Sequence, residues 1–318
     1  MVVKRLPLPM RHAFIVTAYR DLDSLKSLFE QLLDLPNSRV YCHIDARSKQ
    51  LAKDAQHYLE KMRREDARFE RIYLQANQTI RWASSDHFQV QMQLCGLAAQ
   101  DGADYFHTMT GQCRLICTAE RFTQFFQEHA SKSFMELAKM PAAHWSGNGG
   151  LDRVAYYQLY DLLDARRYGR VFDVLNRALL KVQRTLSISR LDSYPSIGNT
   201  FWGGLGYWSL HQSAMQHLLA HPSLQERSYR HSLCAEEFVP QSILMNNPHF
   251  QAHPEQLINH TLRYVHWESS HGEVPGILDA THLPVLTQAQ LQTYPALFAR
   301  KFDSMLSTAL IAQLAISN

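Results

Sequence analysis

Short apolar runs alternate with helix-like segments along the first third of the chain. The runs predict buried strands at 12–19, 39–44, 71–74 and 104–109. Between them, the spacing of apolar and polar residues predicts helices at 22–33 and 48–64, and another that begins after Ser84. Strands that alternate with helices indicate an α/β fold around a parallel sheet, in which ligands bind at the carboxyl ends of the strands.

Polar residues follow two of these predicted strands. Asp45 ends the second strand, and Thr110, Gly111 and Gln112 follow the fourth. Because the carboxyl ends of parallel strands meet at one edge of the sheet, we expect both groups to lie near a binding site.

The segment 166–190 differs from the rest of the chain in its charge. It carries seven cations and the single acid Asp173, while five apolar residues fall on one helical face: Val171, Leu175, Ala178, Val182 and Leu186. Two interpretations stay open at this point. The helix could pack on the domain with a solvated basic face, or it could lie on a membrane surface that contains anionic lipid.

The remainder of the chain returns to short elements. Aromatic residues around glycines at 201–210 have a strand-like pattern. The pattern also predicts another strand at 262–267 and an amphipathic helix at 304–316. No internal repeat or low-complexity linker interrupts the chain. We therefore expect one catalytic domain over 1–318, with a basic helical insertion around 152–195.

Composition narrows the class of protein. A chain of 318 residues with 46% apolar content can bury a large core, and a net charge of +3 is too small to argue for nucleic acid. No apolar stretch reaches the length of a membrane span, and 1–5 lacks the apolar region of a signal peptide. The five cysteines are scattered and show no zinc spacing, which predicts reduced thiols in a cytoplasmic protein.

Two cations inside an apolar frame are the most suggestive chemical feature. Arg300 and Lys301 stand between aromatic residues in the hexapeptide 298–303. Desolvated cations need an anion, and a diphosphate is a natural candidate. The alternative is an ordinary solvated pair at the start of a helix.

Two acidic pairs offer further chemistry. Glu236 and Glu237 precede an apolar turn, and adjacent residues on a helix point about 100° apart, so they do not form an acid–base dyad. One could be a general base while the other caps a helix, or both could serve the helix start. Asp21 and Asp23 form a D-x-D pattern, but they directly precede a predicted helix. We assign them to capping and expect no metal site.

Together these segments resemble the family 14 glycosyltransferases, which include core-2 β-1,6-N-acetylglucosaminyltransferases and peptide O-xylosyltransferases. The resemblance runs from about His12 to Asp303 as six short motifs in the family's order. The motifs are YCHIDARS at 41–48, WAS at 82–84, DYFHTMTGQ at 104–112, GGLGYW at 203–208, the acid Glu237 before Phe238, and FARKFD at 298–303.

The resemblance implies a GT-A-like single-sheet α/β fold and an inverting transfer from a UDP-α-sugar to an acceptor hydroxyl, without a divalent metal or other cofactor. It implies that Glu237 is the general base. Arg300 and Lys301 would neutralise the departing UDP, and Asp45 would hold the nucleoside.

Weaker correspondences follow from the same resemblance. The first group would bind the nucleotide, through the backbone around a uracil slot and a further phosphate contact. The second group, around the glycine-aromatic motif, would contact the acceptor. The first group comprises Val16, Ala18, Trp82 and Arg263, and the second group comprises Glu136, Arg153, Gly204, Tyr207 and Trp208.

Some positions depart from the family's pattern. Cys113 and Leu115 replace its aspartate and proline, and Gly206 stands where xylosyltransferase-like members carry an acid. The change at Gly206 leaves N-acetylglucosamine as the better expectation for the donor sugar. Transfer from UDP-xylose or another UDP-hexose, and a non-catalytic nucleotide-sugar-binding protein, remain the alternatives.

The sequence also suggests where such a protein would work. The lack of an anchor and of paired cysteines indicates a bacterial enzyme of surface glycan synthesis, cytoplasmic or peripheral on the inner membrane face. Its expected partners are a UDP-sugar and a saccharide acceptor, with a lipid-linked saccharide as one option and no nucleic acid.

Overall fold

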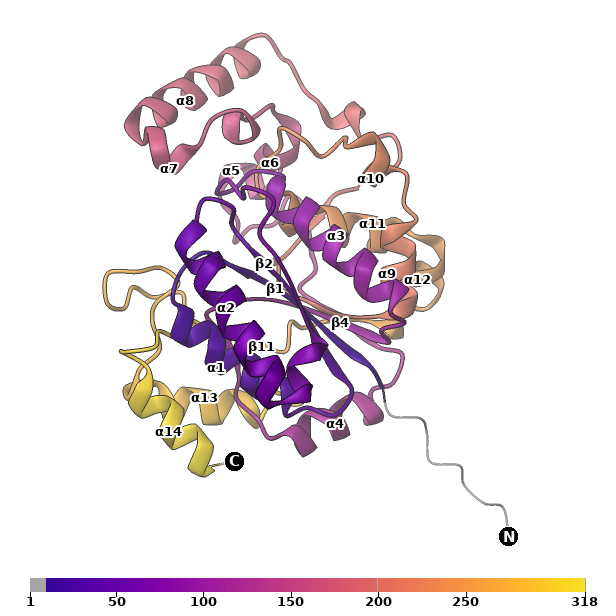
Figure 1. Ribbon diagram of the computed structural model, residues 1–318. Coiled ribbons are helices and arrows are strands. Elements are labelled where there is room, and N and C mark those ends of the chain that lie inside the picture. Colours follow the sequence, from indigo (N-terminus) through magenta and orange to yellow (C-terminus); the bar gives the residue numbers. More distant parts are fainter. Residues whose placement is uncertain (1–9, 199, 318) are drawn as a thin grey trace.

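The computed structural model describes residues 10–198 and 200–317, so the expectation for 1–5 lies outside the described residues. A seven-stranded sheet in the order β10-β6-β9-β4-β1-β2-β3 forms the centre of the molecule, with helices on both faces (Figure 1). The α/β class expected from the sequence is confirmed.

The first third of the chain builds one half of this sheet by strict alternation. β1 pairs in parallel with both β2 and β4, and β2 pairs in parallel with β3. The elements are β1 (His12–Ala18), α1 (Leu22–Leu33), β2 (Ser38–Ile44), α2 (Lys49–Glu65), β3 (Ile72–Gln75), α3 (Asp86–Gln100) and β4 (Tyr105–Thr110). Each lies where the hydrophobic pattern predicts it, because local periodicity and burial agree in this half.

The other half of the sheet is mixed, which corrects the expectation of a parallel sheet. β9 (Ser209–His211) runs antiparallel to β4 and to β6 (Ser133–Met135), and β10 (Leu257–Asn259) runs parallel to β6. The run 201–210 therefore forms strands only at its two ends, since β8 (Trp202–Gly203) belongs to another sheet and 204–208 connect it to β9.

Two small sheets accompany the principal sheet, where one sheet was expected. β7 (Ala138–Lys139) pairs with β8, and β11 (Arg263–Val265) and β5 (Cys113–Leu115) flank β12 (Phe298–Arg300). The hexapeptide at 298–303 thus begins as the middle strand of a sheet, and the proposed helix start is wrong. The last helix, α14 (Thr308–Ser317), begins after the predicted position at Ser304.

The remaining helices are mostly short and join these strands. They are α4 (Ala119–Glu128), α5 (Ser146–Gly149), α6 (Asp152–Ala155), α7 (Ala165–Tyr168), α8 (Arg170–Thr185), α9 (Gln212–Leu219), α10 (Ser223–Glu226), α11 (Val239–Asn246), α12 (Pro248–Ala252) and α13 (Leu283–Gln290). In the described part of the chain, no helix combines the length and the apolar composition needed to cross a lipid bilayer.

The capping role assigned to the D-x-D pattern is confirmed. Asp21 is the N-cap of α1, and its carboxylate accepts hydrogen bonds from the Ser24 backbone nitrogen at 3.0 Å and from the Ser24 hydroxyl at 2.6 Å. It also accepts a bond of 3.0 Å from the backbone nitrogen of Ser304, which ties the C-terminal region to α1. The side chain of Asp23 is 75% exposed and pairs with Lys26.

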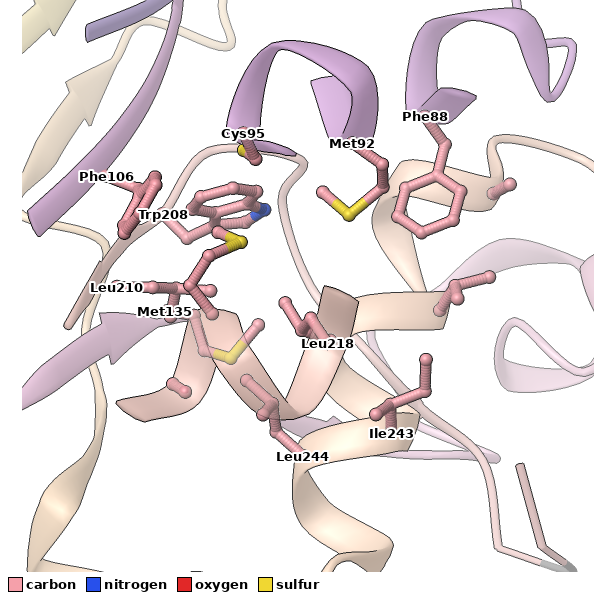
Figure 2. Packing of buried hydrophobic residues seen from close by; sticks show 14 of the residues in the cluster. Phe88, Met92, Cys95, Phe106, Met135, Trp208, Leu210, Leu218, Ile243 and Leu244 are labelled. Atoms are coloured by element: carbon pink, nitrogen blue, oxygen red, sulfur yellow. The ribbon is translucent and has the colours of Figure 1, made fainter. Parts of the chain in front are cut away.

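The two faces of the sheet bury separate hydrophobic clusters. Alternate residues of β1 point to opposite faces, so Ala13 and Ile15 join α3, α9 and α11 while Phe14 and Val16 join α1, α2 and α4. Figure 2 shows the first cluster, where the indole of Trp208 lies among the labelled side chains of Cys95, Phe106 and Leu210.

The basic segment lies apart from both clusters. In Figure 1, α7 and α8 project beyond the main body, above the end of the sheet at which β1 and β2 finish. One face of α8, which includes Val171 and Val174, is exposed.

Candidate active site

Glu237 is positioned by a tight turn at the end of the 3₁₀ helix Ala235–Glu237. Its backbone carbonyl accepts a hydrogen bond of 2.9 Å from the nitrogen of Gly204, and its carboxylate accepts one of 2.5 Å from the Arg153 guanidinium. Arg153, on α6, is itself held over the ring of Trp145 at 4.6 Å. The Glu237 side chain remains 27% exposed, so it stays within reach of a ligand.

The surroundings of Glu237 raise its pKa to about 7. Burial is the main cause, and the nearby carboxylates Glu236 and Glu136 add to it, while the Arg153 cation opposes the rise. A carboxylate that titrates near neutral pH is suited to accept a proton from a hydroxyl group.

Glu236 faces a different set of partners from Glu237. Its carboxylate lies 3.1 Å from Nδ1 of His87, whose Nε2 lies 3.1 Å from the hydroxyl of Thr17 on β1. Its Cγ lies close to Gly206, where an added Cβ would approach it to 2.8 Å. Within the described chain, α11 has no side-chain cap, so the capping alternative for the two glutamates is wrong.

Tyr207 lies beside a cation from the far end of the chain. The guanidinium of Arg300, at the end of β12, is 5.5 Å from the centre of the Tyr207 ring. Burial raises the pKa of Tyr207 to about 12, an effect that Glu237 strengthens and Arg300 opposes. Arg300 donates to the hydroxyl of Thr110, and its Nε has no partner among the described residues.

Lys301 is already engaged by an acid, which the sequence did not indicate. It is 4% exposed and donates to Glu273, whose carboxylate also accepts two hydrogen bonds from Arg20, at 2.6 and 2.9 Å. Arg20 and Lys301 together lower the pKa of Glu273 to about 2. Arg20 and Lys301 both bind this carboxylate, and Arg300 directly precedes Lys301 in the chain, so the three cations, which form the cationic corner, outnumber the acid.

Asp45 is the residue expected to bind the nucleoside, but its carboxylate already accepts several hydrogen bonds from neighbouring residues. Its carboxylate accepts from the backbone and guanidinium nitrogens of Arg47 at 2.7 to 3.0 Å, and from the backbone nitrogen of Ile80 at 3.2 Å. Burial disfavours its charged form, yet the bonds from Arg47 outweigh this and lower its pKa. A nucleoside that binds Asp45 must therefore displace or share Arg47.

Two predicted contact residues are structural instead. Trp208 is fully buried in the hydrophobic cluster that α3, α9 and α11 form with the sheet, so its side chain does not reach a substrate (Figure 2). Arg263 donates to the carbonyls of Thr261, Thr108 and Trp208, and burial lowers its pKa to about 10. This bonding favours a structural role over the expected phosphate contact, because the guanidinium already satisfies three backbone acceptors.

The two predicted positions on β1 do not reach the site equally. Val16 lies within the ladder between β2 and β4, where it pairs with Cys42 and Met109. Its backbone therefore lies inside the sheet, which corrects the expectation that it lines a uracil slot. Ala18 ends the strand, and its carbonyl accepts a hydrogen bond of 2.9 Å from the nitrogen of Asp45. Only Ala18 belongs to the carboxyl edge.

The other predicted positions line the same region. The indole of Trp82 is 51% exposed and lies 5.8 Å from the ring of Tyr160. The carboxylate of Glu136 accepts a bond of 2.9 Å from the nitrogen of Leu205, beside Gly204. A Cβ at Gly204 would clash with the carbonyl oxygen of Glu136, so only glycine allows this approach.

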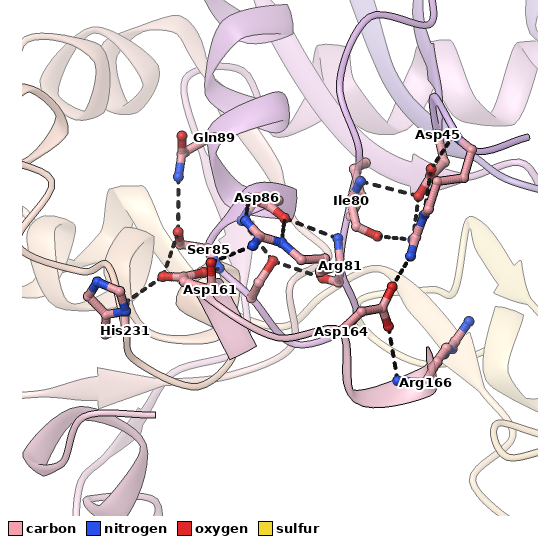
Figure 3. Close-up of polar contacts among 12 residues, drawn as sticks. Asp45, Ile80, Arg81, Ser85, Asp86, Gln89, Asp161, Asp164, Arg166 and His231 are labelled. Atoms are coloured by element: carbon pink, nitrogen blue, oxygen red, sulfur yellow. Dashed lines mark hydrogen bonds and ion pairs between the residues drawn. The ribbon is translucent and has the colours of Figure 1, made fainter. Parts of the chain in front are cut away.

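A polar network joins the carboxyl edge of the sheet to the basic segment (Figure 3). Asp161 accepts from the backbone nitrogens of Ser85 at 2.7 Å and His231 at 2.5 Å, and from the Ser85 hydroxyl at 3.0 Å. Asp164 caps α7 and pairs with Arg47, the partner of Asp45. These acids gave no sequence signal, because their partners are distant along the chain.

Candidate metal ligands do not gather in the described residues: no group of three or more His, Cys, Asp or Glu side chains is arranged there to hold an ion. What the site assembles is a carboxylate that titrates near neutral pH, a cationic corner, and a tyrosine whose pKa is affected by Glu237 and by Arg300. Arg20, Arg47 and Glu273 are the members that sequence reasoning missed.

Comparison with known proteins agrees with the resemblance drawn from the motifs. The family model for the core-2/I-branching enzymes matches residues 12–285, a span that ends before the hexapeptide 298–303. No curated protein matches the chain at a significant level. Among solved structures, the apo crystal structure of mouse xyloside xylosyltransferase 1 is similar over 91% of this chain and 97% of that chain.

That similarity is loose, with a TM-score of 0.33 and 10% sequence identity, and such values do not by themselves establish a common fold. The family match, in contrast, covers most of the chain and includes Glu237, Arg153 and Asp45. The chain belongs to the core-2/I-branching enzyme family of glycosyltransferases.

Proposed function

We propose that this protein is an inverting glycosyltransferase that moves a sugar from a UDP-α-sugar to a hydroxyl of a saccharide acceptor, without a divalent metal. N-acetylglucosamine is the donor sugar that we favour. The observation that supports the proposal best is a carboxylate, Glu237, whose pKa is about 7, together with the Arg300 cation 5.5 Å from the ring of Tyr207, a residue whose pKa both charges affect.

The reaction needs a proton acceptor on one side of the sugar and a positive charge on the other. Glu237 would take the proton of the acceptor hydroxyl as its oxygen attacks the anomeric carbon. The bond from that carbon to the diphosphate oxygen breaks in the same step, and its electron pair leaves with UDP. Attack opposite to the leaving group converts the α-sugar to a β-linkage.

The cationic corner would stabilise the charge that develops on UDP. Arg300 has an unpartnered Nε, and its cation is permanent, so it can bind a phosphate oxygen at any physiological pH. Lys301 and Arg20 share Glu273, which leaves their combined charge positive. A diphosphate can therefore bind here without a metal ion to offset its charge.

Residues on the acceptor side would orient the attacking hydroxyl. Arg153 fixes the Glu237 carboxylate at 2.5 Å, and Glu136 and Gly204 build the adjoining turn. The acceptor that we propose is a saccharide of a bacterial surface glycan, assembled at the cytoplasmic face of the membrane. A lipid-linked saccharide fits this setting.

The direct test measures transfer from radiolabelled UDP-sugars to a saccharide panel, in EDTA and with manganese. We expect equal rates in both, and loss of transfer on chelation would contradict the metal-free mechanism. The Glu237→Gln variant should lose roughly a hundredfold to ten-thousandfold in rate while it retains UDP binding. Retained turnover would reassign the base, with Glu236 as the next candidate.

The alternatives give different results in the same experiments. Preferred turnover of UDP-xylose or another UDP-hexose would change the donor but keep the mechanism, because donor choice depends on contacts worth only about 1–3 kcal/mol each. UDP binding by calorimetry without turnover on any donor and acceptor would instead indicate a non-catalytic nucleotide-sugar-binding protein.

A further inference from the structure

The helix α8 turns its apolar stripe away from the protein. Val171 and Val174 are 61% and 58% exposed, and the stripe continues through Leu175 and Val182 to Leu186, just past the helix. The buried side carries Phe172 together with the polar residues Asn176 and Gln183. An amphipathic helix of a globular protein normally does the reverse, so α8 presents an apolar surface to its surroundings. We call this stripe the α8 outer face.

Specific hydrogen bonds hold the helix in this orientation. The amide of Asn176 accepts from the backbone nitrogen of Leu159 at 3.0 Å and donates to the side chain of Gln158 at 2.9 Å. The amide of Gln183 accepts from the Tyr157 nitrogen at 2.8 Å and donates to the Tyr157 carbonyl at 2.9 Å. Rotation of α8 to bury its apolar stripe would break all four bonds, so the exposure of that stripe is built into the fold.

Cations border the α8 outer face on one side. Arg170, Arg177 and Lys181 are exposed and recur along one edge of the helix, and Arg167 continues the edge onto α7. Asp173 is the one acid within α8. Two other cations of the segment are occupied, since Arg184 pairs with Asp152 and Arg190 is buried. The free charge on this surface is therefore strongly positive.

We propose that the α8 outer face binds a membrane surface that contains anionic lipid. The apolar stripe would enter the boundary between headgroups and acyl chains while the bordering cations contact lipid phosphates. A second copy of the chain is a poorer fit, because a twofold contact would set the same row of cations against itself. A nucleic acid would leave the valine and leucine stripe without a partner.

The same segment reaches the candidate active site through one chain of contacts. Asp164 caps α7 by accepting from the nitrogens of Arg166 and Arg167, and it pairs with Arg47, which binds Asp45. Docking of the α8 outer face would therefore bring the carboxyl edge of the sheet near the membrane. Lipid binding itself does not rest on the proposed transfer reaction, so the two can fail independently.

Co-sedimentation with vesicles tests the proposal on the full chain. We expect binding to vesicles of phosphatidylglycerol and phosphatidylcholine, little binding to phosphatidylcholine alone, and weaker binding as salt increases. Replacing three cations, in R170Q/R177Q/K181Q, should weaken partitioning roughly hundredfold. Replacing two apolar residues, in V171S/V174S, should weaken it about tenfold or more.

Two matched control variants test whether vesicle binding depends on the α8 outer face and not on the total charge or the total exposed apolar area of the protein. K53Q/K61Q/R64Q removes three exposed cations from α2, and L291S/M305S removes two exposed apolar side chains elsewhere. Both should bind vesicles as the unaltered protein does. Equal binding to both kinds of vesicle, or α8 variants that behave like these controls, would overturn the proposal. Self-association that only V171S/V174S abolishes would assign the face to a second copy.

Discussion

Adjacent glutamates acquire different chemistry from their three-dimensional surroundings. Glu237 is held by Arg153 and titrates near pH 7, whereas Glu236 faces His87 on α3. The sequence indicated that the two do not act as a dyad, because neighbouring residues on a helix diverge. It could not predict the raised pKa of Glu237, since burial and the like charge of Glu136 arise only in the folded chain.

Removal of Arg153 should move the pH dependence of transfer. The base must be ionised to act, so kcat/KM should fall below about pH 7, by roughly tenfold per pH unit. Arg153 opposes the raised pKa of Glu237, so Arg153→Gln should raise that pKa further and shift the inflection to higher pH. Arg153→Lys, which keeps a cation, should shift it less. An inflection that stays in place in both variants would remove Glu237 as the titrating group.

At the level of elements, the hydrophobic pattern predicted the strands that have their own periodicity, but it did not predict the strands that are defined by long-range pairing. The alternating first third, from β1 to β4, formed as predicted because each of those strands and helices carries its own periodicity. The aromatic runs at 201–210 and 298–303 did not, since β8, β9 and β12 are defined by partners elsewhere in the chain. Strands of two or three residues are too short to show a periodicity of their own.

The buried acid Asp161 joins the basic insertion to Ser85 and His231, and its loss should destabilise the protein. Asp161→Ala leaves two backbone nitrogens and the Ser85 hydroxyl without their acceptor. Buried unsatisfied donors cost about 1–3 kcal/mol each, so the free energy of unfolding should fall by about 2 kcal/mol or more. Urea denaturation measures this.

Asp192, an exposed acid farther along the same segment, provides the control for this substitution. Asp192→Ala should change the free energy of unfolding by less than about 0.5 kcal/mol. Equal midpoints in urea for the two variants would mean that Asp161 does not hold the insertion.

On the scale of the whole molecule, the site is assembled from distant parts of the sequence. Arg300 at the end of β12 donates to Thr110 at the end of β4, and Gly204, in the connection that leads to β9, donates to the backbone carbonyl of Glu237. Arg20 and Lys301 share Glu273 across this junction. A ligand bound there contacts several parts of the fold at once, and its binding should therefore stabilise the whole chain.

UDP should raise the unfolding temperature, and the cationic corner should account for most of the effect. A ligand at one hundred times its Kd stabilises the folded state by about 2.7 kcal/mol. The R300A/K301A variant should lose most of the shift, and manganese should not restore it. The matched variant K61A/R64A, which removes an exposed pair from α2, should keep the full shift. A thermal-shift assay with and without manganese makes the comparison.

The sequence by itself determined the α/β class, the capping role of Asp21 and the resemblance that singled out Glu237 and Arg300. These features depend on local periodicity, on a cap within one turn, or on short motifs, and all three are written in consecutive residues. Only the tertiary structure decided that Trp208 and Arg263 are structural, that Glu273 engages Lys301, and that α8 exposes its apolar stripe. Those outcomes depend on burial and on partners far away in the chain, which no local pattern encodes.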